Sequence, residues 1–276
     1  MIEMREAGPN DRDAILALRR RVFAHEDVEK QEPAFWDWEF ERGRMFVAED
    51  EGRVVGHFGF VPRQFSIGDA LLAVDAMVDP EARRSGVFTR LVRFAIDGVR
   101  NDVRLAIAWQ IRRAVLAGML RAGFQALLTA PVLLRPTLLS IPIPIPRRSP
   151  TVTELVDRRR FDDSPIWRYT RRENDGAHLI SRDSVLKGIT THCLVDFGGE
   201  PRALRPLVRE AIGDARRRGV RLAAALVSRD HPHFATLLRC GFFPGPHRFR
   251  FLALSFDPML SLEQRWALTW ASTDHV

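Results

Sequence analysis

One short stretch of the chain, residues 78–91 with the sequence VDPEARRSGVFTRL, combines residue types that can hold an anion. It joins an apolar run that ends in Asp-Pro to a segment with apolar residues at helical spacing, through two arginines, a serine and a glycine. The first turn of a helix leaves backbone N–H groups without partners inside the helix, and the helix dipole adds partial positive charge there. The stretch therefore predicts a site for a phosphate or diphosphate group.

The residues of this stretch contribute to the predicted site in different ways. Gly86 has no Cβ, so the backbone can approach an anion closely. The arginines supply full charges, and the residues after them supply backbone N–H donors. The predicted binding residues are Arg83, Arg84, Ser85, Gly86, Val87, Phe88 and Thr89. The competing interpretation is an exposed, arginine-rich helix start that binds nothing.

The composition is that of a globular chain with an excess of arginine. The 276 residues include 46% hydrophobic and 28% charged side chains, and the formal net charge is +7. Lys30 and Lys187 are the only lysines, and guanidinium groups pair with oxyanions in a bidentate manner. The charge therefore suits phosphate-bearing partners such as a nucleotide cofactor or nucleic acid, although biased codon usage would produce the same excess.

Several classes of protein are not expected. Cys193 and Cys240 are too few for a metal site or a disulfide framework, and we expect two buried thiols in a reducing compartment. His231 and His233 lack a third metal ligand at suitable spacing. The first residues carry acidic side chains and no apolar signal-peptide core, and prolines interrupt the most apolar run, residues 126–146. We predict a cytoplasmic protein with no bound metal and no membrane span.

Three segments recur in the same order at nearly constant spacing. LVRFAI (91–96) recurs as LVREAI (207–212), VRLAIAW (103–109) as VRLAAALV (220–227), and LRAGF (120–124) as LRCGF (238–242). Each set is typical of a helix, a buried parallel strand and a helix that ends at glycine. We therefore predict an α/β (α+β) fold of two related lobes, residues 1–145 and 146–276, each a mixed twisted sheet flanked by helices.

The first lobe can be followed in more detail. Its predicted elements are a strand at 3–7, helices around 11–24 and 33–41, a hairpin at 45–61 that turns at 50–52, and a strand at 70–78. The proline-rich segment 130–150 is expected to cross to the second lobe, and its run IPIPIP (141–146) is expected to be extended and edge-like. A ligand for an SH3-type domain is the alternative for that segment.

The anion-binding stretch and its surroundings resemble the GNAT superfamily of acyl-CoA-dependent N-acetyltransferases. The pyrophosphate loop of that family reads Arg/Gln-x-x-Gly-x-Gly/Ala between a strand and a helix, and residues 83–88 match it except that Phe88 replaces the small residue. The ring of Phe88 either lies along the helix flank or narrows the pocket. The segments FWDWEF (35–40), IWRY (166–169) and WALTWASTD (266–274) resemble a two-lobed subgroup. The resemblance implies acetyl-CoA (coenzyme A) as co-substrate.

The resemblance also implies a role for main-chain amides, and it shows that the side chain usually acting as the acid is absent. The thioester carbonyl would be held by backbone amides near Met77 and Val78. The acid for the thiolate is often a tyrosine four residues before the glycine that closes the following helix. Met119 stands at that position, and Leu237 stands there in the second lobe. The usual acid is therefore absent.

The second lobe is expected to be a degenerate copy. The spacing of the LVR match places residues 199–204 opposite the loop, where Glu200 would repel a phosphate and Pro201 lacks an N–H donor. We expect this lobe to bind no coenzyme A. Its role would be to complete the core, to form a wall of the acceptor cleft, or both.

Candidates for the remaining chemistry come from the strands around the loop. Asp75 interrupts an apolar strand and is the first candidate for the base, with a structural aspartate at a bulge as the alternative. His57 is the second candidate, although a strand histidine is more often structural. Trp109 and Gln110 end the next strand and are predicted to line the substrate wall, or in the case of Trp109 to pack. Asp274 and His275 could close the cleft or lie in solvent.

Our first hypothesis is an N-acyltransferase that moves an acetyl group from acetyl-CoA to a small-molecule amine, for example an amino sugar, by direct attack in a ternary complex. The alternatives are a non-catalytic module that binds acyl-CoA, and a nucleic-acid binder that uses the arginine runs at 158–161 and 216–219. The arginine runs lack regularly interleaved aromatic residues, so we expect no nucleic-acid partner. A homodimer is left open.

Overall fold

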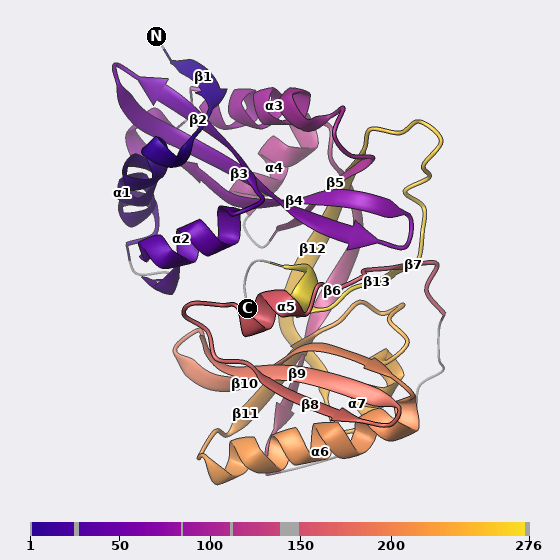
Figure 1. Ribbon diagram of the computed structural model, residues 1–276. Helices are drawn as coiled ribbons and strands as arrows, with labels where there is room; N and C mark the ends of the chain where they lie inside the picture. The colour runs from indigo at the N-terminus through magenta and orange to yellow at the C-terminus, as the bar shows by residue number, and fades with distance from the viewer. Residues whose placement is uncertain (1, 25–27, 84, 111–112, 139–148, 274–276) are drawn as a thin grey trace.

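All the main strands lie in a single mixed sheet of eleven strands, which the helices cover from both sides (Figure 1). The computed structural model describes residues 2–24, 28–83, 85–110, 113–138 and 149–273. The strand order is β1-β2-β3-β4-β5-β12-β6-β11-β10-β9-β8, and β7 and β13 form a separate pair. The predicted fold class, a twisted mixed sheet flanked by helices, is confirmed.

The elements of the N-terminal half lie close to the predicted ranges. They are β1 (Glu3–Glu6), η1 (Pro9–Asp11), α1 (Arg12–Val22), η2 (Val28–Gln31), α2 (Pro33–Phe40), β2 (Arg44–Asp50), β3 (Arg53–Phe65), β4 (Gly68–Val78), η3 (Pro80–Ala82), α3 (Val87–Val99), β5 (Leu105–Gln110), α4 (Arg113–Arg121) and β6 (Gln125–Pro136). The elements labelled η are short 3₁₀ helices. Of the proline-rich segment 130–150, residues 130–136 form the end of β6, which has a neighbouring strand on each side, whereas residues 139–148, with the run predicted as extended and edge-like at 141–146, lie outside the described residues.

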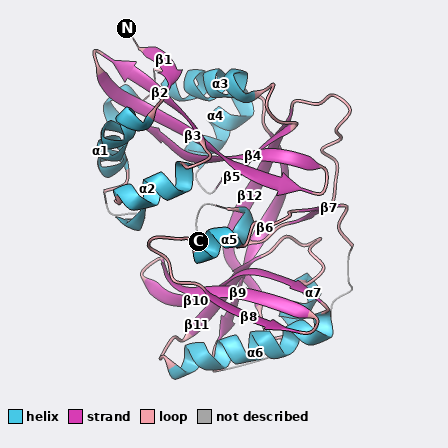
Figure 2. Cartoon of the chain, in the orientation of Figure 1, coloured by secondary structure: helices cyan, strands magenta, loops and turns pink. Residues whose placement is uncertain are grey.

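The C-terminal half repeats much of this order. Its elements are β7 (Val152–Thr153), α5 (Arg159–Asp162), β8 (Thr170–Asn174), β9 (Ala177–Leu186), β10 (Ile189–Gly199), α6 (Pro201–Arg217), β11 (Leu222–Leu226), α7 (Phe234–Arg239), β12 (Phe243–Ser255), β13 (Trp266–Ala267) and η4 (Trp270–Ser272). Helices α3 and α4 lie at one end of the sheet and α6 and α7 at the other, as Figure 2 shows in cyan.

The repeated sequence segments take up equivalent structures. Helices α3 and α6 each bury one stripe of apolar residues against the sheet. Strand β5 is parallel to β4, and β11 is parallel to β10. Helices α4 and α7 both stop just before a glycine with a left-handed backbone, Gly123 at φ 106° and Gly241 at φ 87°. These elements were predicted by the internal repeat, and the structure confirms them.

Strands are exchanged between the two halves of the sheet. Strand β12, from the end of the second repeat, pairs antiparallel with β5 of the first, where Phe251 lies opposite Trp109. Strand β6, from the end of the first repeat, pairs antiparallel with β11 of the second, and β6 and β12 pair with each other in the middle. The sheet therefore runs without a break across the middle of the molecule, while the lobe boundary at residues 145 and 146 falls outside the described residues and stays a prediction.

The two faces of the sheet carry different cores. Alternate residues of a strand point to opposite faces, so Leu72 and Val74 of β4 join a core with α1 and α2, whereas Leu71 and Ala73 join a core with α3 and α4. In the C-terminal half, α6 and α7 cover a third core. The C-terminal segment that contains Trp266 lies in the first of these cores, which extends across both halves.

Two of the buried histidines are held in their neutral form. His57 of β3 has no exposed surface, and burial lowers its pKa to about 4. His231 follows β11, and burial with the neighbouring His233 lowers its pKa to about 3. An unfolded chain would protonate these rings below about pH 6.5, whereas the folded protein resists protonation until the pH is much lower.

We predict that the free energy of unfolding decreases as the pH falls from about 6.5 to 4. Only the unfolded state takes up the two protons over most of this range, so acid favours unfolding. For His57 alone, a shift from 6.5 to about 4 corresponds to on the order of 3 kcal/mol. Urea unfolding at several pH values checks this. His57→Gln should flatten the pH dependence, and His247→Gln at an exposed position should leave it unchanged; an equal slope in all three proteins would contradict the assignment.

Candidate active site

The junction between β4 and α3 forms the loop that the sequence predicted. Residues 79–86 separate the two elements, and the loop is held by its own side chains. The Nε of Arg83 donates to the Val78 carbonyl oxygen over 3.2 Å, and the Ser85 hydroxyl donates to the Ala82 carbonyl oxygen over 2.7 Å. Arg84 lies outside the described residues. These two bonds tie the side chains of Arg83 and Ser85 to the main chain that precedes them.

The start of α3 presents free backbone donors. Gly86 caps the helix in a left-handed conformation, φ 76°, and a Cβ at this position would meet nothing within 4 Å. The first bond of the helix runs from the Arg90 N–H to the Gly86 carbonyl oxygen, 3.2 Å. The N–H groups of Val87, Phe88 and Thr89 precede that bond and have no partner within the helix. An anion at this point would meet several donors and the positive end of the dipole.

The ring of Phe88 lies between two helices. A Cβ added to Gly118 of α4 would lie 2.3 Å from the Phe88 Cδ1 atom, so the ring occupies the space that a side chain at Gly118 would need. The ring also packs on the core beneath α3 and α4. Of the two predicted placements, the ring takes the one along the flank of the helix, and the backbone N–H of Phe88 remains at the helix start.

Strands β4 and β5 separate next to this loop. They pair in parallel from Ala70 with Leu105 to Ala73 with Ala108, and the pairing stops there. Beyond that point β4 continues with β3 alone, while β5 continues with β12. The main-chain groups on one edge of β4 are therefore left without a neighbouring strand from residue 74 onward.

The register of β3 and β4 directs one of those main-chain groups into the opening. The Asp79 N–H donates to the Val55 carbonyl oxygen over 2.8 Å. Because hydrogen-bonded and non-hydrogen-bonded pairs alternate in an antiparallel ladder, the N–H and C=O groups of Val78 point away from β3. The N–H of Val78 thus faces the side on which β5 has left. Met77 lies opposite His57 in the ladder and directs its N–H toward β3.

A bulge in β4 sets this register. Asp75 and Ala76 lie together opposite Phe58, and Asp75 has a positive φ of 49°. Its buried carboxylate forms an ion pair with Arg19 of α1, whose side chain is only 2% exposed. An Asp75 that accepted a proton would lose this ion pair with a buried guanidinium. The structural alternative considered for Asp75, an aspartate at a bulge, therefore describes its position, whereas its catalytic role stays a prediction.

His57 supports the same bulge from the neighbouring strand. Its Nδ1 donates to the Asp75 carbonyl oxygen over 3.0 Å, and its ring packs against Trp36 and Phe40 of α2, with centroids 5.2 and 5.8 Å away. Its Nε2 is buried without a hydrogen-bond partner. The ring is neutral at physiological pH because burial lowers its pKa to about 4.

Trp109 lies where β5 has parted from β4. It is the residue after the last β4–β5 pair, and its ring packs against Phe251 and Phe249 of β12, with centroids 5.1 and 6.4 Å away. Its indole N–H is buried and has no hydrogen-bond partner. The Trp109 ring is therefore packed against β12, while its indole N–H has no acceptor. Gln110 ends the same strand, and its side chain lies outside the description.

No tyrosine replaces the missing acid in the described part of this half. Met119 is fully buried in the core between α4 and the sheet, and Leu237 is fully buried in the equivalent core of the second half. The only tyrosine of the chain, Tyr169, lies in the second half, where burial raises its pKa to about 12.

The equivalent opening in the second half is filled. Strands β10 and β11 pair only from Thr191 with Leu222 to Leu194 with Ala225. The C-terminal segment lies beyond that point, where Thr269 forms a bridge with Val227 and η4 contacts β10. Glu200 alone separates β10 from α6, so no loop exists there to surround a phosphate. Both features distinguish this half from the N-terminal half, and its lack of coenzyme A binding stays a prediction.

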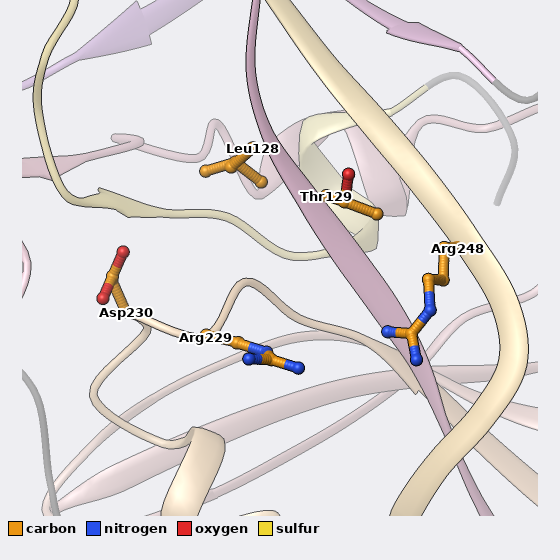
Figure 3. A pocket seen from close by; sticks show the side chains of 5 residues that line it. All are labelled: Leu128, Thr129, Arg229, Asp230 and Arg248. Atoms are coloured by element: carbon orange, nitrogen blue, oxygen red, sulfur yellow. The ribbon is translucent and has the colours of Figure 1, made fainter.

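Two shallow depressions lie elsewhere on the surface. One of about 490 Å³ lies beside β6 and β12, and Figure 3 shows Arg229 and Arg248 extending into it from different elements, with Asp230 to one side. The other, of about 470 Å³, lies between η2 and the strands β8 to β10. Among the described residues, no cluster of three or more histidine, cysteine, aspartate or glutamate side chains could hold a metal ion. No helix in the described part of the chain is long and apolar enough to cross a membrane.

Sequence reasoning missed Arg19 as the partner of Asp75. A signal existed, because the buried stripe of α1 includes Ile15, Leu16 and Leu18 and continues at Arg19. An arginine at the helical spacing of a buried stripe indicates an acidic partner in the core. It also missed Gly118, for which no local signal exists, because the contact with Phe88 depends on how two helices cross.

We predict that Gly118→Ala destabilises the protein, although alanine in a helix normally stabilises it by up to about 1 kcal/mol. The added methyl group would collide with the Phe88 ring and cost about 1–3 kcal/mol. Phe88→Ala should make Gly118→Ala harmless again. Thermal unfolding of the two single variants and the double variant checks this, and additive effects in the double variant would show that the two residues do not share this space.

Comparisons with known proteins agree with this geometry. Residues 3–121 match the family model described as an acetyltransferase (GNAT) domain. No curated protein matches the chain in sequence. Similar solved structures include a GCN5-related N-acetyltransferase from Kribbella flavida, at 12% identity and a TM-score of 0.67 over 93% of this chain and 72% of that one. Eis1 from Mycobacterium abscessus is 13% identical, with a TM-score of 0.61 over 93% and 74% of the two chains.

A third similar structure is the glucosamine N-acetyltransferase region of a fungal multi-domain beta-N-acetylglucosaminidase. It is 13% identical, with a TM-score of 0.59 over 92% of this chain and 38% of that one. At these identities the structures show a shared fold, which extends over both halves of the chain. The matched domain contains the parted strands and the glycine loop described above. Residues 3–121, a little less than half of the chain, therefore match a GNAT acetyltransferase domain.

Proposed function

We propose that the N-terminal half transfers an acetyl group from acetyl-CoA to the primary amine of a small molecule. One observation carries the proposal. The opening between β4 and β5 adjoins a glycine loop with free N–H donors, whereas the equivalent opening in the second half is filled by the chain itself. The protein would therefore use one site per chain.

The residues around the loop fit the diphosphate of coenzyme A. Main-chain N–H groups from Ser85 to Thr89 would donate to it, and Arg83 and Arg84 would supply charge. Bound there, acetyl-CoA supplies an activated acyl group as a thioester. The Val78 N–H, which faces the opening, would stabilise negative charge on the carbonyl oxygen during attack. The acceptor amine would approach between the parted strands, past Trp109 and Gln110.

The proposed proton acceptor for the amine is Asp75, acting directly or through a water molecule. Its ion pair with Arg19 fixes the carboxylate and the bulge together. His57 is proposed to position that bulge through its hydrogen bond to the Asp75 carbonyl oxygen. The amine nitrogen then bonds to the carbonyl carbon as the carbon–sulfur bond breaks. The departing thiolate needs little help near neutral pH, because ordinary thiols ionise at about 8.5.

One observation favours a second function. Met119 stands where the usual tyrosine would protonate the thiolate, and it is fully buried. A protein that binds acyl-CoA without transferring the acyl group would need no acid at this position. Acceptor-dependent thiol release separates this function from catalysis.

We predict that coenzyme A binds with a stoichiometry of one per chain. Gly86→Val should abolish binding, because a β-branched residue is strained at φ 76° and would stand among the donors. Isothermal titration calorimetry with acetyl-CoA measures both effects. Glu200→Gln, at the equivalent junction of the second half, is the matched control and should bind normally. Two sites per chain, or equal binding by Gly86→Val, would refute the proposed site.

We predict that Asp75→Asn lowers kcat by roughly 10²–10⁴-fold while the affinity for acetyl-CoA changes little, because loss of a general base affects proton transfer. Thiol release with a panel of amines that includes glucosamine provides the assay. A protein that releases thiol with no amine in the panel while it still binds acetyl-CoA would favour the binding module. If Asp75→Asn instead weakened acetyl-CoA binding and left kcat intact, Asp75 would serve only the shape of β4.

A further inference from the structure

The depression between η2 and the second half of the sheet contains polar groups that lack partners. Arg182, Trp167 and His192 line it, and each is more than nine-tenths buried. The Arg182 Nε, the Trp167 Nε1 and the His192 Nε2 atoms are buried without a hydrogen-bond partner. Because the His192 Nδ1 donates to Asp183, its Nε2 is an acceptor, whereas the Arg182 Nε and the Trp167 Nε1 are donors. Buried polar atoms normally have partners, so two unpartnered donors beside one depression of about 470 Å³ point to a ligand with acceptor atoms.

The guanidinium of Arg182 is held in place without a counter-charge. Its Cζ lies 4.3 Å from the centre of the Trp167 ring and 5.8 Å from that of Tyr169. Among the described residues, no carboxylate lies within 4 Å of its nitrogen atoms. The side chain is only 7% exposed. A buried cation without an anionic partner is costly, and stacking on aromatic rings offsets only part of that cost.

Other charged residues also line the depression. Asp183 is occupied, since it accepts hydrogen bonds from Arg218 over 2.9 Å and pairs with the His192 Nδ1 over 2.6 Å. Arg168 and Glu29 of η2 also line the depression, and both are exposed. Among the described residues that line the depression, Arg182 is therefore the buried cation with no carboxylate within 4 Å.

Access to Arg182 results from the short edge strand β8. The ladder between β8 and β9 begins at Thr170 with Ser181, so β9 has no neighbour on that side at Arg182 and Asp183. Trp167 covers Arg182 from one side and itself packs on Phe35 of α2, with ring centroids 4.9 Å apart. The depression thus lies where the N-terminal half meets the C-terminal half.

We propose that this depression binds an oxyanion, the carboxylate or phosphate group of a small molecule, on Arg182. The Nε–H of Arg182 and the indole N–H of Trp167 are obligatory donors, so the ligand must present acceptor oxygens. Charge-assisted hydrogen bonds from a guanidinium to an oxyanion are among the stronger ones in proteins. The site is separate from the proposed acetyl-transfer site, and it does not depend on that function.

The test compares anion binding by variants that differ in one charge. Inorganic phosphate and succinate are titrated against the full chain at matched ionic strength, with thermal unfolding and calorimetry as readouts. Arg182→Met keeps an apolar contact with Trp167 but removes the donors, and should weaken binding by about tenfold or more. Without anions its midpoint should equal or exceed that of the wild type, because the unpaired buried cation is gone. Phosphate and succinate distinguish the two oxyanion classes.

Three controls make the outcome decisive. Arg248→Met removes an exposed arginine from the depression in Figure 3 and should keep the full response, since general salt effects would act on it equally. Trp167→Phe keeps the ring over Arg182, removes one donor and should weaken binding less than Arg182→Met. Arg83→Ala removes a charge from the glycine loop and thereby shows whether the anions bind there instead. Absence of any anion response, or a response that Arg83→Ala abolishes and Arg182→Met retains, would overturn the proposal whether or not acetyl-CoA binds.

Discussion

The separation of β4 from β5 is the constraint on which the rest of the site depends. Two parallel strands that stop pairing expose main-chain groups that would be costly to leave without partners in a closed core. The bulge at Asp75 makes this possible, because it fixes which groups of β4 face the gap. The ion pair with Arg19 and the hydrogen bond from His57 then hold the bulge from the side of α1 and α2. A cofactor arm would replace the missing strand.

The two halves meet the same constraint in different ways. In the N-terminal half the gap is left beside a loop whose donors are free. In the C-terminal half the chain closes the gap with its own segment around Thr269 and joins β10 to α6 through Glu200 alone. The C-terminal half therefore closes the opening that the N-terminal half keeps, and its sheet edge at Arg182 carries the oxyanion site that we propose.

Local features of the site could be predicted from the sequence, and long-range ones could not. The glycine loop, the repeated helices and the strand ends follow from Gly86 and from the spacing of apolar residues, which act over a few positions. The ring of Phe88 could not be placed, because Gly118 lies thirty positions away on another helix. The insertion of β12 beside β5 left no local trace either, since an apolar strand is compatible with several neighbours. Arg19 was recognisable only by its place on a buried helical stripe.

The exchange of β6 and β12 has a consequence for the independence of the two halves. Each half supplies its final strand to the sheet beside the other half, so removing either half would leave an unpaired sheet edge. A half joined in this way is needed for its strand, whatever other role it has.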